Sequence, residues 1–170
     1  NKYATKVEVR YLQEIFGRLP NVLGHKMKYV ELSRDLSSRK IKVALDLLQK
    51  ARLTLPCIHT QASGLPLSAQ ADKTIYKLYF LDVGLYHYWV KLSWADLQTQ
   101  DALLLTKGIA AEQFVAQHLA YLEEGLEEPS LYYWLRDGKG EKAELDFLAV
   151  FGSRIIPIEV KAGASGKLKS

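Results

Sequence analysis

Three charged residues lie in two segments near the C-terminal end that are otherwise apolar. Asp146 lies within residues 143–150, and Glu159 and Lys161 lie two positions apart within residues 155–161. Both segments are predicted strands, and because side chains alternate along a strand, Glu159 and Lys161 are expected to share one face. Charged groups on a buried strand are unfavourable unless they are paired or bind a metal ion. We therefore interpret these residues as a candidate site rather than as packing.

The same residues have the chemistry of a divalent-metal site. Asp146 and Glu159 offer the hard oxygen ligands that Mg²⁺ or Mn²⁺ prefers. Lys161 would stabilise the negative charge of a hydroxide or of a reacting phosphate. Glu112, within the helix predicted over 108–122, could complete the site. The alternative is a salt-bridged trio without a metal, and the short spacing pattern does not separate the two.

A second group of charged residues is basic and lies in the first third of the chain. Arg39, Lys40 and Lys42 fall near the start of a helix predicted over 39–51, and Arg34 precedes it. Basic side chains on a helix that enters a DNA groove give mostly sequence-independent affinity for phosphates. The first turn contains no Asn or Gln to read bases, so little sequence specificity is expected. The alternative is a solvated helix face in a domain that only joins two others.

The elements that must position these residues fall into two groups. The first group begins with three predicted helices, over 7–16, 29–32 and 39–51. Two predicted strands, over 53–59 and 75–81, follow them around a loop rich in Ser, Gly and Pro. Three helices followed by a two-stranded hairpin is the winged-helix plan, whose third helix enters the DNA major groove in many such domains.

The second group is a strong helix over 108–122 followed by three strand candidates. The strands are predicted over 131–135, 143–150 and 155–161. An Asp-Gly turn between the first two predicts that they form a hairpin. On the middle strand, Glu144, Asp146 and Leu148 are expected to share one face. The order of elements predicts an α/β (α+β) fold.

Composition excludes several classes of protein. The chain has 170 residues, with 48% hydrophobic and 25% charged residues, which is typical of a globular domain and too hydrophobic for disorder. No apolar run approaches the roughly 18 residues of a membrane span. The single cysteine, Cys57, excludes an internal disulfide and a four-cysteine zinc site. We expect a cytoplasmic protein without a membrane partner.

The charge is distributed unevenly along the chain. Residues 1–60 contain 12 basic and 5 acidic residues, whereas residues 61–170 contain 11 basic and 14 acidic residues. Such a split is typical of two modules with different partners. The alternative is an ordinary fluctuation of surface charge.

These motifs resemble a known group of proteins. Asp146, the Glu159 to Lys161 motif and the upstream Glu112 resemble the PD-(D/E)XK, or restriction-endonuclease-like, nuclease superfamily. Four ordered motifs, over 78–85, 108–115, 131–134 and 158–163, extend the similarity across nearly the whole chain. Together they resemble the domain of unknown function that follows the ATPase module in many predicted bacterial and archaeal AAA-family ATPases.

The resemblance implies a fold with two modules. A winged-helix-like module would span 1–81, and a restriction-endonuclease-like mixed sheet flanked by helices would span 82–170. The chain ends ten residues after Val160, at Ser170, so the second domain is expected to be incomplete. An AAA ATPase module of the same protein is the implied partner. ATP would bind only there, because this chain has no G-x-x-x-x-G-K-[ST] motif.

Two functions follow as expectations. The first is metal-dependent hydrolysis of DNA phosphodiester bonds, with Lys161, Asp146 and Glu159 as catalytic residues. Asp146, Glu159 and Glu112 would then hold Mg²⁺ or Mn²⁺. The alternative is a non-enzymatic regulatory, nucleic-acid-binding or protein-interaction appendage of the ATPase, since a fold does not fix a function. Both are compatible with an oligomer.

Overall fold

The computed structural model describes the backbone of residues 6–91, 100–122, 131–137 and 142–161. Its first part contains three helices and a 3-10 turn: α1 (Lys6–Arg18), η1 (Leu19–Asn21), α2 (Tyr29–Leu32) and α3 (Ser38–Lys50). A hairpin with a 3-10 turn in its loop follows: β1 (Thr54–Thr60), η2 (Leu67–Gln70) and β2 (Ala71–Phe80). The remaining elements are α4 (Val83–Val90), α5 (Gln100–Leu122), β3 (Leu131–Asp137), β4 (Lys142–Phe151) and β5 (Arg154–Ile158).

The three predicted N-terminal helices are confirmed, and their ends have physical causes. α1 gives way to the 3-10 turn at Pro20, which cannot donate a hydrogen bond to the helical ladder. α3 buries the apolar stripe Ile41, Leu45 and Leu48 and leaves its other face in solvent. Asp82 caps α4, because its side chain accepts a hydrogen bond from the Gly84 amide at 2.7 Å.

All five strands belong to one mixed sheet in the order β2-β1-β3-β4-β5. β1 pairs antiparallel with β2 and parallel with β3, and the other two pairings are antiparallel. The parallel pairing requires a crossover, which α4 and α5 supply. A mixed sheet flanked by helices confirms the α+β class. The predicted module boundary at residues 81 and 82 falls between β2 and α4, and the sheet continues across it.

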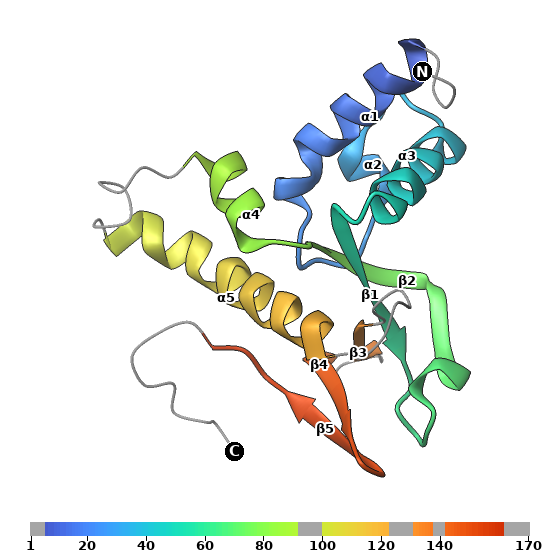
Figure 1. Cartoon of the computed structure of the whole chain (residues 1–170), viewed down its shortest axis with the longest axis vertical. Coiled ribbons are helices and arrows are strands. Elements are labelled where there is room, and N and C mark those ends of the chain that lie inside the picture. The colour runs from blue at the N-terminus through green and yellow to red at the C-terminus, as the bar shows by residue number, and fades with distance from the viewer. Residues whose placement is uncertain (1–5, 92–99, 123–130, 138–141, 162–170) are drawn as a thin grey trace.

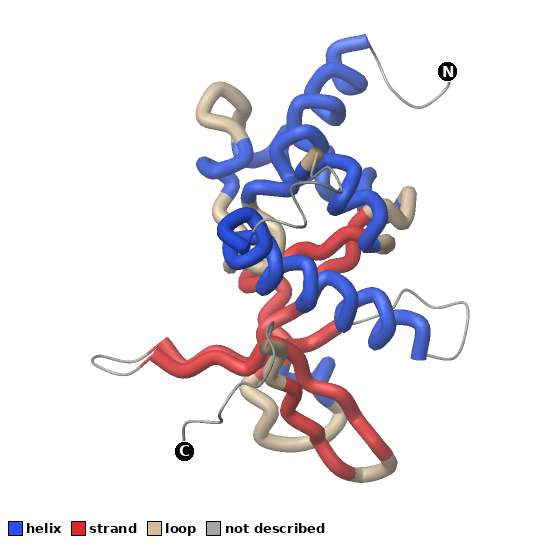
Figure 2. Tube along the Cα trace, turned by 90° about the vertical axis from the view of Figure 1, so that its left-hand side faces the viewer, coloured by secondary structure: helices blue, strands red, loops and turns tan. Residues whose placement is uncertain are grey.

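The two faces of β2 pack against two different cores. Leu78 and Phe80 point toward α1 and α3 and belong to a first cluster of buried side chains. Tyr79 points to the opposite face and packs with Ala116 and Ala120 of α5. The helices of the first part and α5 therefore cover opposite faces of this strand (Figure 1). Figure 2 shows most of the helices gathered at one end of the molecule and most of the strands at the other.

The third predicted strand is shorter than expected. β5 ends at Ile158, so Glu159 and Lys161 lie just beyond it instead of within it. β4 and β5 are joined by a tight turn in which Gly152 has a φ of +59°, a conformation that glycine adopts without strain. The Asp-Gly turn predicted between β3 and β4 lies outside the described residues. Among the described residues, no helix is long and apolar enough to cross a membrane.

Candidate active site

The most unusual residue of the sheet is a buried lysine. Lys77 is only 3% exposed, although it lies in the middle of β2. Cys57 of β1 is its cross-strand partner and belongs to the cluster of buried side chains that packs with α5, so Lys77 points toward that cluster as well. This cluster, the α5-side core, consists of Leu55, Cys57, Tyr79, Ala116, Ala120, Leu131, Tyr133 and Phe147. Burial raises the pKa of the Cys57 thiol far above its usual value, so this thiol is protonated and unreactive. The lysine therefore sits in an apolar layer, where its charge needs partners.

A bulge in β4 places acidic side chains on this same face. Leu145 pairs with Trp134 and Leu148 pairs with Tyr132, so two residues of β4 lie opposite Tyr133 alone. Tyr133 is fully buried in the α5-side core. Leu148 shares the face of Tyr132, so the expectation that Leu148 lies on one face with Glu144 and Asp146 is wrong. Strict alternation fails here because the extra residue at the bulge shifts the residues after it to the opposite face of the sheet.

Glu144 lies on the α5 side of the sheet, N-terminal to the bulge in β4. It pairs with Leu135, which packs against the α5-side core. Its carboxylate forms an ion pair with Lys77 across the sheet. The Lys77 Nζ also lies 5.0 Å from the centre of the Tyr133 ring, a cation–π distance. The pair is asymmetric, because the Lys77 side chain is 4% exposed whereas the Glu144 side chain is 42% exposed.

Glu112 reaches the same region from α5. Its Oε2 accepts a hydrogen bond from the Tyr79 hydroxyl at 2.8 Å. Burial raises the pKa of Glu112, and the Tyr79 hydrogen bond and the positive charge of Lys77 oppose that shift. The negative charges of Asp146 and Glu144 act in the raising direction. Of these carboxylates, Glu144 is the one that forms an ion pair with Lys77.

Close approach of a loop to Glu112 depends on a glycine. Gly24 has a φ of +72°, and a Cβ atom added there would lie 3.2 Å from the Glu112 Oε2. The Gly24 amide also donates a hydrogen bond to the Leu78 carbonyl at 3.1 Å. A side chain at this position would strain the backbone and crowd the carboxylate.

Two glutamines fix α5 against the end of β2. Gln113 is fully buried, and its side-chain amide donates to the Phe80 carbonyl at 2.6 Å. Its side-chain oxygen accepts from the Phe80 amide at 2.7 Å. One turn later, the Gln117 oxygen accepts from the Val83 amide at 2.8 Å. Glu112 is the immediate neighbour of Gln113, so these bonds set where its carboxylate lies.

Asp146 is held by the chain that follows β5. Its Oδ2 accepts a hydrogen bond from the Val160 amide at 2.7 Å. Glu159 and Lys161 flank that amide, and both are exposed. Neither makes a hydrogen bond or ion pair with the residues that the structure describes. The structure thus gives Glu112 and Asp146 each a hydrogen-bond donor, the Tyr79 hydroxyl and the Val160 amide, whereas Glu159 and Lys161 lie exposed beyond β5.

The predicted metal ligands do not form a closed cage in the described part of the chain. No group of three or more His, Cys, Asp or Glu side chains there is arranged to hold a metal ion. Glu112 and Asp146 are two hard oxygen donors, and that number suits Mg²⁺. This cation keeps several waters and is often bound by one or two carboxylates with the phosphates of a substrate.

Lys77 and Glu144 were not among the predicted site residues. The signal for Lys77 was available, because a lysine interrupts the apolar run 75–81 on the face of Tyr79. The same argument predicts Glu159 and Lys161 as site residues. The signal for Glu144 was weaker, because its direction depends on the bulge and no residue type marks the position of that bulge.

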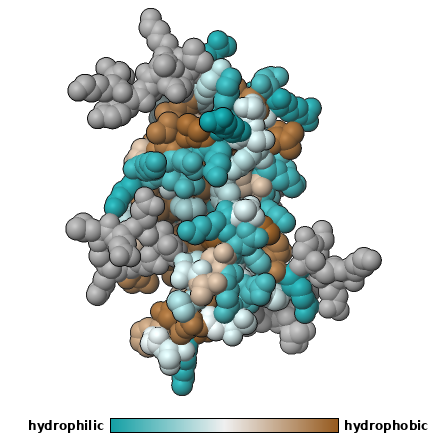
Figure 3. All heavy atoms as spheres, turned by 90° about the vertical axis from the view of Figure 1, so that its right-hand side faces the viewer, coloured by the Kyte–Doolittle hydropathy of each residue, from teal (hydrophilic) through white to brown (hydrophobic). Residues whose placement is uncertain are grey.

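The four predicted nucleic-acid-binding residues are all exposed, on α3 or just before it. They are Arg34, Arg39, Lys40 and Lys42. The Lys40 Nζ donates to the Tyr11 hydroxyl at 3.1 Å, which ties this side chain to α1. Lys42 lines a groove of about 750 Å³ between α3 and the β1–β2 hairpin, with Lys73 also in its lining. Hydrophilic side chains cover much of this side of the molecule (Figure 3).

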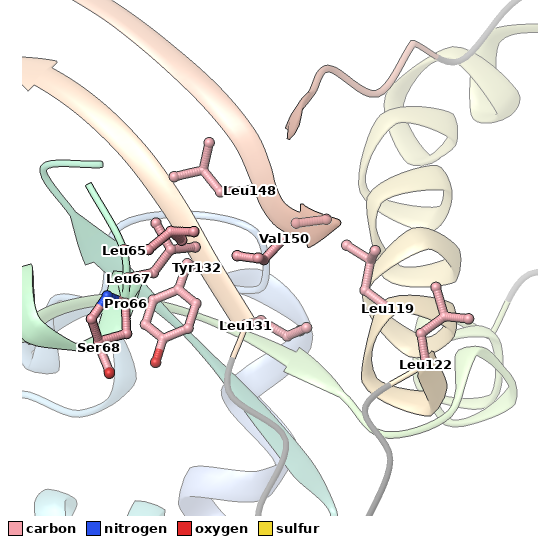
Figure 4. A pocket seen from close by; sticks show the side chains of 11 residues that line it. Leu65, Pro66, Leu67, Ser68, Leu119, Leu122, Leu131, Tyr132, Leu148 and Val150 are labelled. Atoms are coloured by element: carbon pink, nitrogen blue, oxygen red, sulfur yellow. The ribbon is translucent and has the colours of Figure 1, made fainter. Parts of the chain in front are cut away.

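A second hollow differs from this groove because its lining is mostly apolar. It has a volume of about 650 Å³ and is lined mostly by leucines and other apolar residues, including Leu119 of α5 and Leu148 of β4 (Figure 4). The cis peptide between Leu65 and Pro66 lies in the loop that forms one wall. Among the described residues, no acidic or basic side chain lines it.

The ion pair leads to a stability prediction. We expect Glu144→Gln to destabilise the fold by about 1–3 kcal/mol, because Lys77 stays buried and loses its partner. The value is modest for an ion pair because solvent reaches the Glu144 side of it. The double variant Lys77→Met/Glu144→Gln should recover most of the loss, because it removes the buried charge as well. Urea unfolding measures both, and an equal loss in the single and double variants would contradict the assignment.

Two family models match the chain. The family described as Domain of unknown function (DUF8612) matches residues 1–96, which is more than half of the chain. The family described as Domain of unknown function (DUF4143) matches residues 107–170. No curated protein and no solved structure matches the chain. The second match covers Glu112, Asp146, Glu159 and Lys161.

Proposed function

We propose that this chain, which belongs to the family described as Domain of unknown function (DUF8612), hydrolyses phosphodiester bonds in nucleic acids. The site would lie between α5, which carries Glu112, and β4, which carries Asp146. One observation carries the proposal. Two carboxylates that are 34 residues apart approach one region of the sheet: Glu112 bonds Tyr79, two residues from the buried Lys77, and Asp146 lies two residues from Glu144, which pairs with Lys77. Ionisable groups gathered and partly buried in this way are characteristic of functional sites.

The chemistry of the donors fits a divalent cation. Glu112 and Asp146 would hold Mg²⁺ or Mn²⁺, and the bound cation would supply charge stabilisation at the phosphate and a more acidic water. The chain's own residues keep both carboxylates in place. The Tyr79 hydroxyl holds Glu112, and the Val160 amide holds Asp146. Lys161 and Glu159, which flank that amide, would lie at the edge of the site where a substrate phosphate arrives.

We infer that the chain works as the C-terminal part of an AAA-family ATPase. The resemblance of its four ordered motifs supports this, as does the domain of unknown function that matches residues 107–170. The ATPase module of the same protein would be its partner and would bind the ATP. Nucleic-acid cleavage or binding would then be coupled to ATP-driven movement.

A cleavage assay tests the proposed activity. Labelled single- and double-stranded DNA is incubated with the protein and Mg²⁺ or Mn²⁺. We expect cleavage that stops when a chelator removes the cation, and Asp35→Asn, which alters an exposed acid, should cleave normally. Absence of cleavage with both metals, or cleavage that persists in the chelator, would contradict metal-dependent hydrolysis.

A second candidate function is nucleic-acid binding without catalysis. One observation favours it: the exposed face of α3 presents basic residues beside a groove that Lys42 and Lys73 line. Three helices and a hairpin in this order have the arrangement of a winged helix, in which the third helix meets DNA. This candidate needs only the basic half, whereas hydrolysis needs the carboxylate face as well.

Salt dependence tests the binding surface. We expect Arg39→Ala/Lys42→Ala to weaken DNA binding and to lower the slope of log K against log[salt] by roughly 2, because each phosphate contact contributes about 0.9. Fluorescence anisotropy over a salt series measures both quantities. Lys50→Ala, at the other end of α3, is the control and should change little. A slope that is unchanged in the double variant would exclude these side chains from the contact.

A further inference from the structure

We propose that the groove between α3 and the β1–β2 hairpin binds a single strand of nucleic acid, with unpaired bases stacked on its tyrosines. This inference deepens the second candidate function and rests on it, because both require nucleic acid at the basic half of the chain. It names the form of the nucleic acid and places the contact on the sheet as well as on α3. The groove, called the α3 groove below, has Tyr29, Tyr76, Tyr132, Lys42, Lys73 and Asp46 in its lining.

A row of three side chains crosses the strands that line the α3 groove. Ile58 of β1 pairs with Tyr76 of β2 on one side and with Tyr132 of β3 on the other. In each of these strands the next residue points toward α5, so the row lies on the opposite face of the sheet. The two tyrosines are two strands apart, which is a separation of roughly 10 Å. The pairing of three strands thus fixes two aromatic rings on one face.

The tyrosines differ in how firmly they belong to the protein interior. All three are partly exposed. The Tyr76 hydroxyl donates to the Tyr29 hydroxyl at 3.3 Å, and both rings pack against the first cluster of buried side chains. Within the described part of the chain, Tyr132 packs against neither buried cluster. Tyr132 is therefore the ring with the most surface left for a ligand.

The charges of the α3 groove suit a phosphate backbone. Lys42 of α3 and Lys73 of β2 both line it, and both are exposed. Asp46 is the one acid among the described lining residues, so two lysines and one aspartate give a net charge of +1. Arg39, one turn before Lys42 on α3, adds a further exposed cation. A basic groove with aromatic side chains is the arrangement by which proteins bind single strands.

The aromatic lining favours an unpaired strand over a duplex. In a duplex the faces of the bases are covered by stacking, so a tyrosine ring reaches them only when the strand is unpaired. The α3 groove also meets the apolar hollow, because Ser68 and Tyr132 line both. Figure 4 shows Tyr132 beside Pro66 and Ser68 at this border. The lysine end therefore suits phosphates, and the end beyond Tyr132 suits the apolar faces of bases.

Binding of strands with and without bases tests the stacking. Fluorescence anisotropy compares labelled oligothymidine, oligouridine and an abasic strand of equal length, which keeps the phosphates but has no bases. We expect wild type to bind oligothymidine about tenfold more tightly than the abasic strand, because stacking adds to the phosphate contacts. Tyr132→Leu should abolish this preference, whereas Tyr132→Phe, which keeps the ring, should retain it. Oligouridine distinguishes RNA from DNA as the source of the strand.

Two charge variants of opposite sign test the path of the phosphates. Asp46→Asn should bind all three strands about threefold more tightly, and Lys73→Met should bind them about threefold more weakly, because each changes the charge of the lining by one unit. Asp35→Asn removes an exposed acid outside the lining and is the matched control, which should bind as wild type does. Asp46→Asn with the affinity of wild type would contradict this path.

The outcomes separate the inference from the second candidate function. Wild type that binds the abasic strand as tightly as oligothymidine, or Tyr132→Leu that keeps the wild-type preference, would overturn the inference and leave phosphate binding by α3 intact. Wild type that binds neither a single strand nor a duplex would contradict nucleic-acid binding and the inference together. Circular dichroism shows which variants are folded. If Tyr132→Leu unfolds, the comparison of the two strands with wild type and the opposite effects of Asp46→Asn and Lys73→Met still decide.

Discussion

Asp146→Asn should lower the rate of metal-dependent DNA cleavage at least about 100-fold. The change removes one of the two anionic oxygen donors of the proposed site, and removal of a charged group that stabilises a transition state has effects of this order or larger. Asparagine keeps a side-chain oxygen that can accept the hydrogen bond from the Val160 amide. The fold should therefore remain, and the loss should appear in the chemical step rather than in stability.

Single-turnover cleavage at saturating DNA measures this loss. DNA affinity should stay within about twofold of wild type, because α3 and not Asp146 carries the proposed phosphate contacts. A variant that cleaves at the wild-type rate would contradict a role for Asp146. Lost cleavage together with lost thermal stability would instead make Asp146 a structural residue.

Gln113→Leu should destabilise the protein by about 2–4 kcal/mol. Gln113 bonds both the amide and the carbonyl of Phe80, which is fully buried. Leucine has a similar volume but leaves these two backbone groups without partners, and each buried unsatisfied group costs about 1–3 kcal/mol. Urea unfolding followed by circular dichroism measures the change in free energy.

The control for this change is Gln13→Leu in α1. Gln13 is exposed, so its replacement should alter stability by less than about 0.5 kcal/mol. An equally small effect of Gln113→Leu would show that α5 is held by its apolar contacts alone. A large effect on stability would support the position of Glu112, since the two residues are neighbours on the helix.

Helices were predicted well where one local feature of the sequence determined their buried face or their end. The stripe Ile41, Leu45 and Leu48 predicts the buried face of α3, and that face is confirmed. Pro20 predicts the end of α1, and a 3-10 turn begins beside it. These outcomes depend on neighbours within one or two turns, so the sequence around each residue contains the required information.

The site was harder to predict because it depends on register. Strict alternation along 143–150 places Leu148 with Asp146, but a bulge opposite Tyr133 separates them. A bulge is a property of two paired strands, and nothing in one strand alone specifies it. The end of β5 before Glu159 is likewise set by pairing with β4. The residue types of the site were therefore predictable, whereas the face that each occupies was not.

Lys77 is a charged residue of the site whose position in a strand is visible in the sequence. A lysine among the apolar residues of β2 carries the same signal as charged residues in the last strands. The structure pairs Lys77 with Glu144 and places it two residues from Tyr79, which bonds Glu112, so the candidate site includes residues of β2, β4 and α5. The basic α3 face and this candidate site then belong to two parts of one sheet-based fold.

The most direct test of the central claim is a double-variant comparison of Glu112→Gln and Asp146→Asn in the metal-dependent cleavage assay. Glu112→Gln keeps a side-chain oxygen that can accept from Tyr79, as Asp146→Asn does for Val160. If the two carboxylates act as one unit, the double variant should be no slower than the slower single variant, because groups that act together lose their effect together. Losses that multiply, or a Glu112→Gln variant with the wild-type rate, would contradict a shared site.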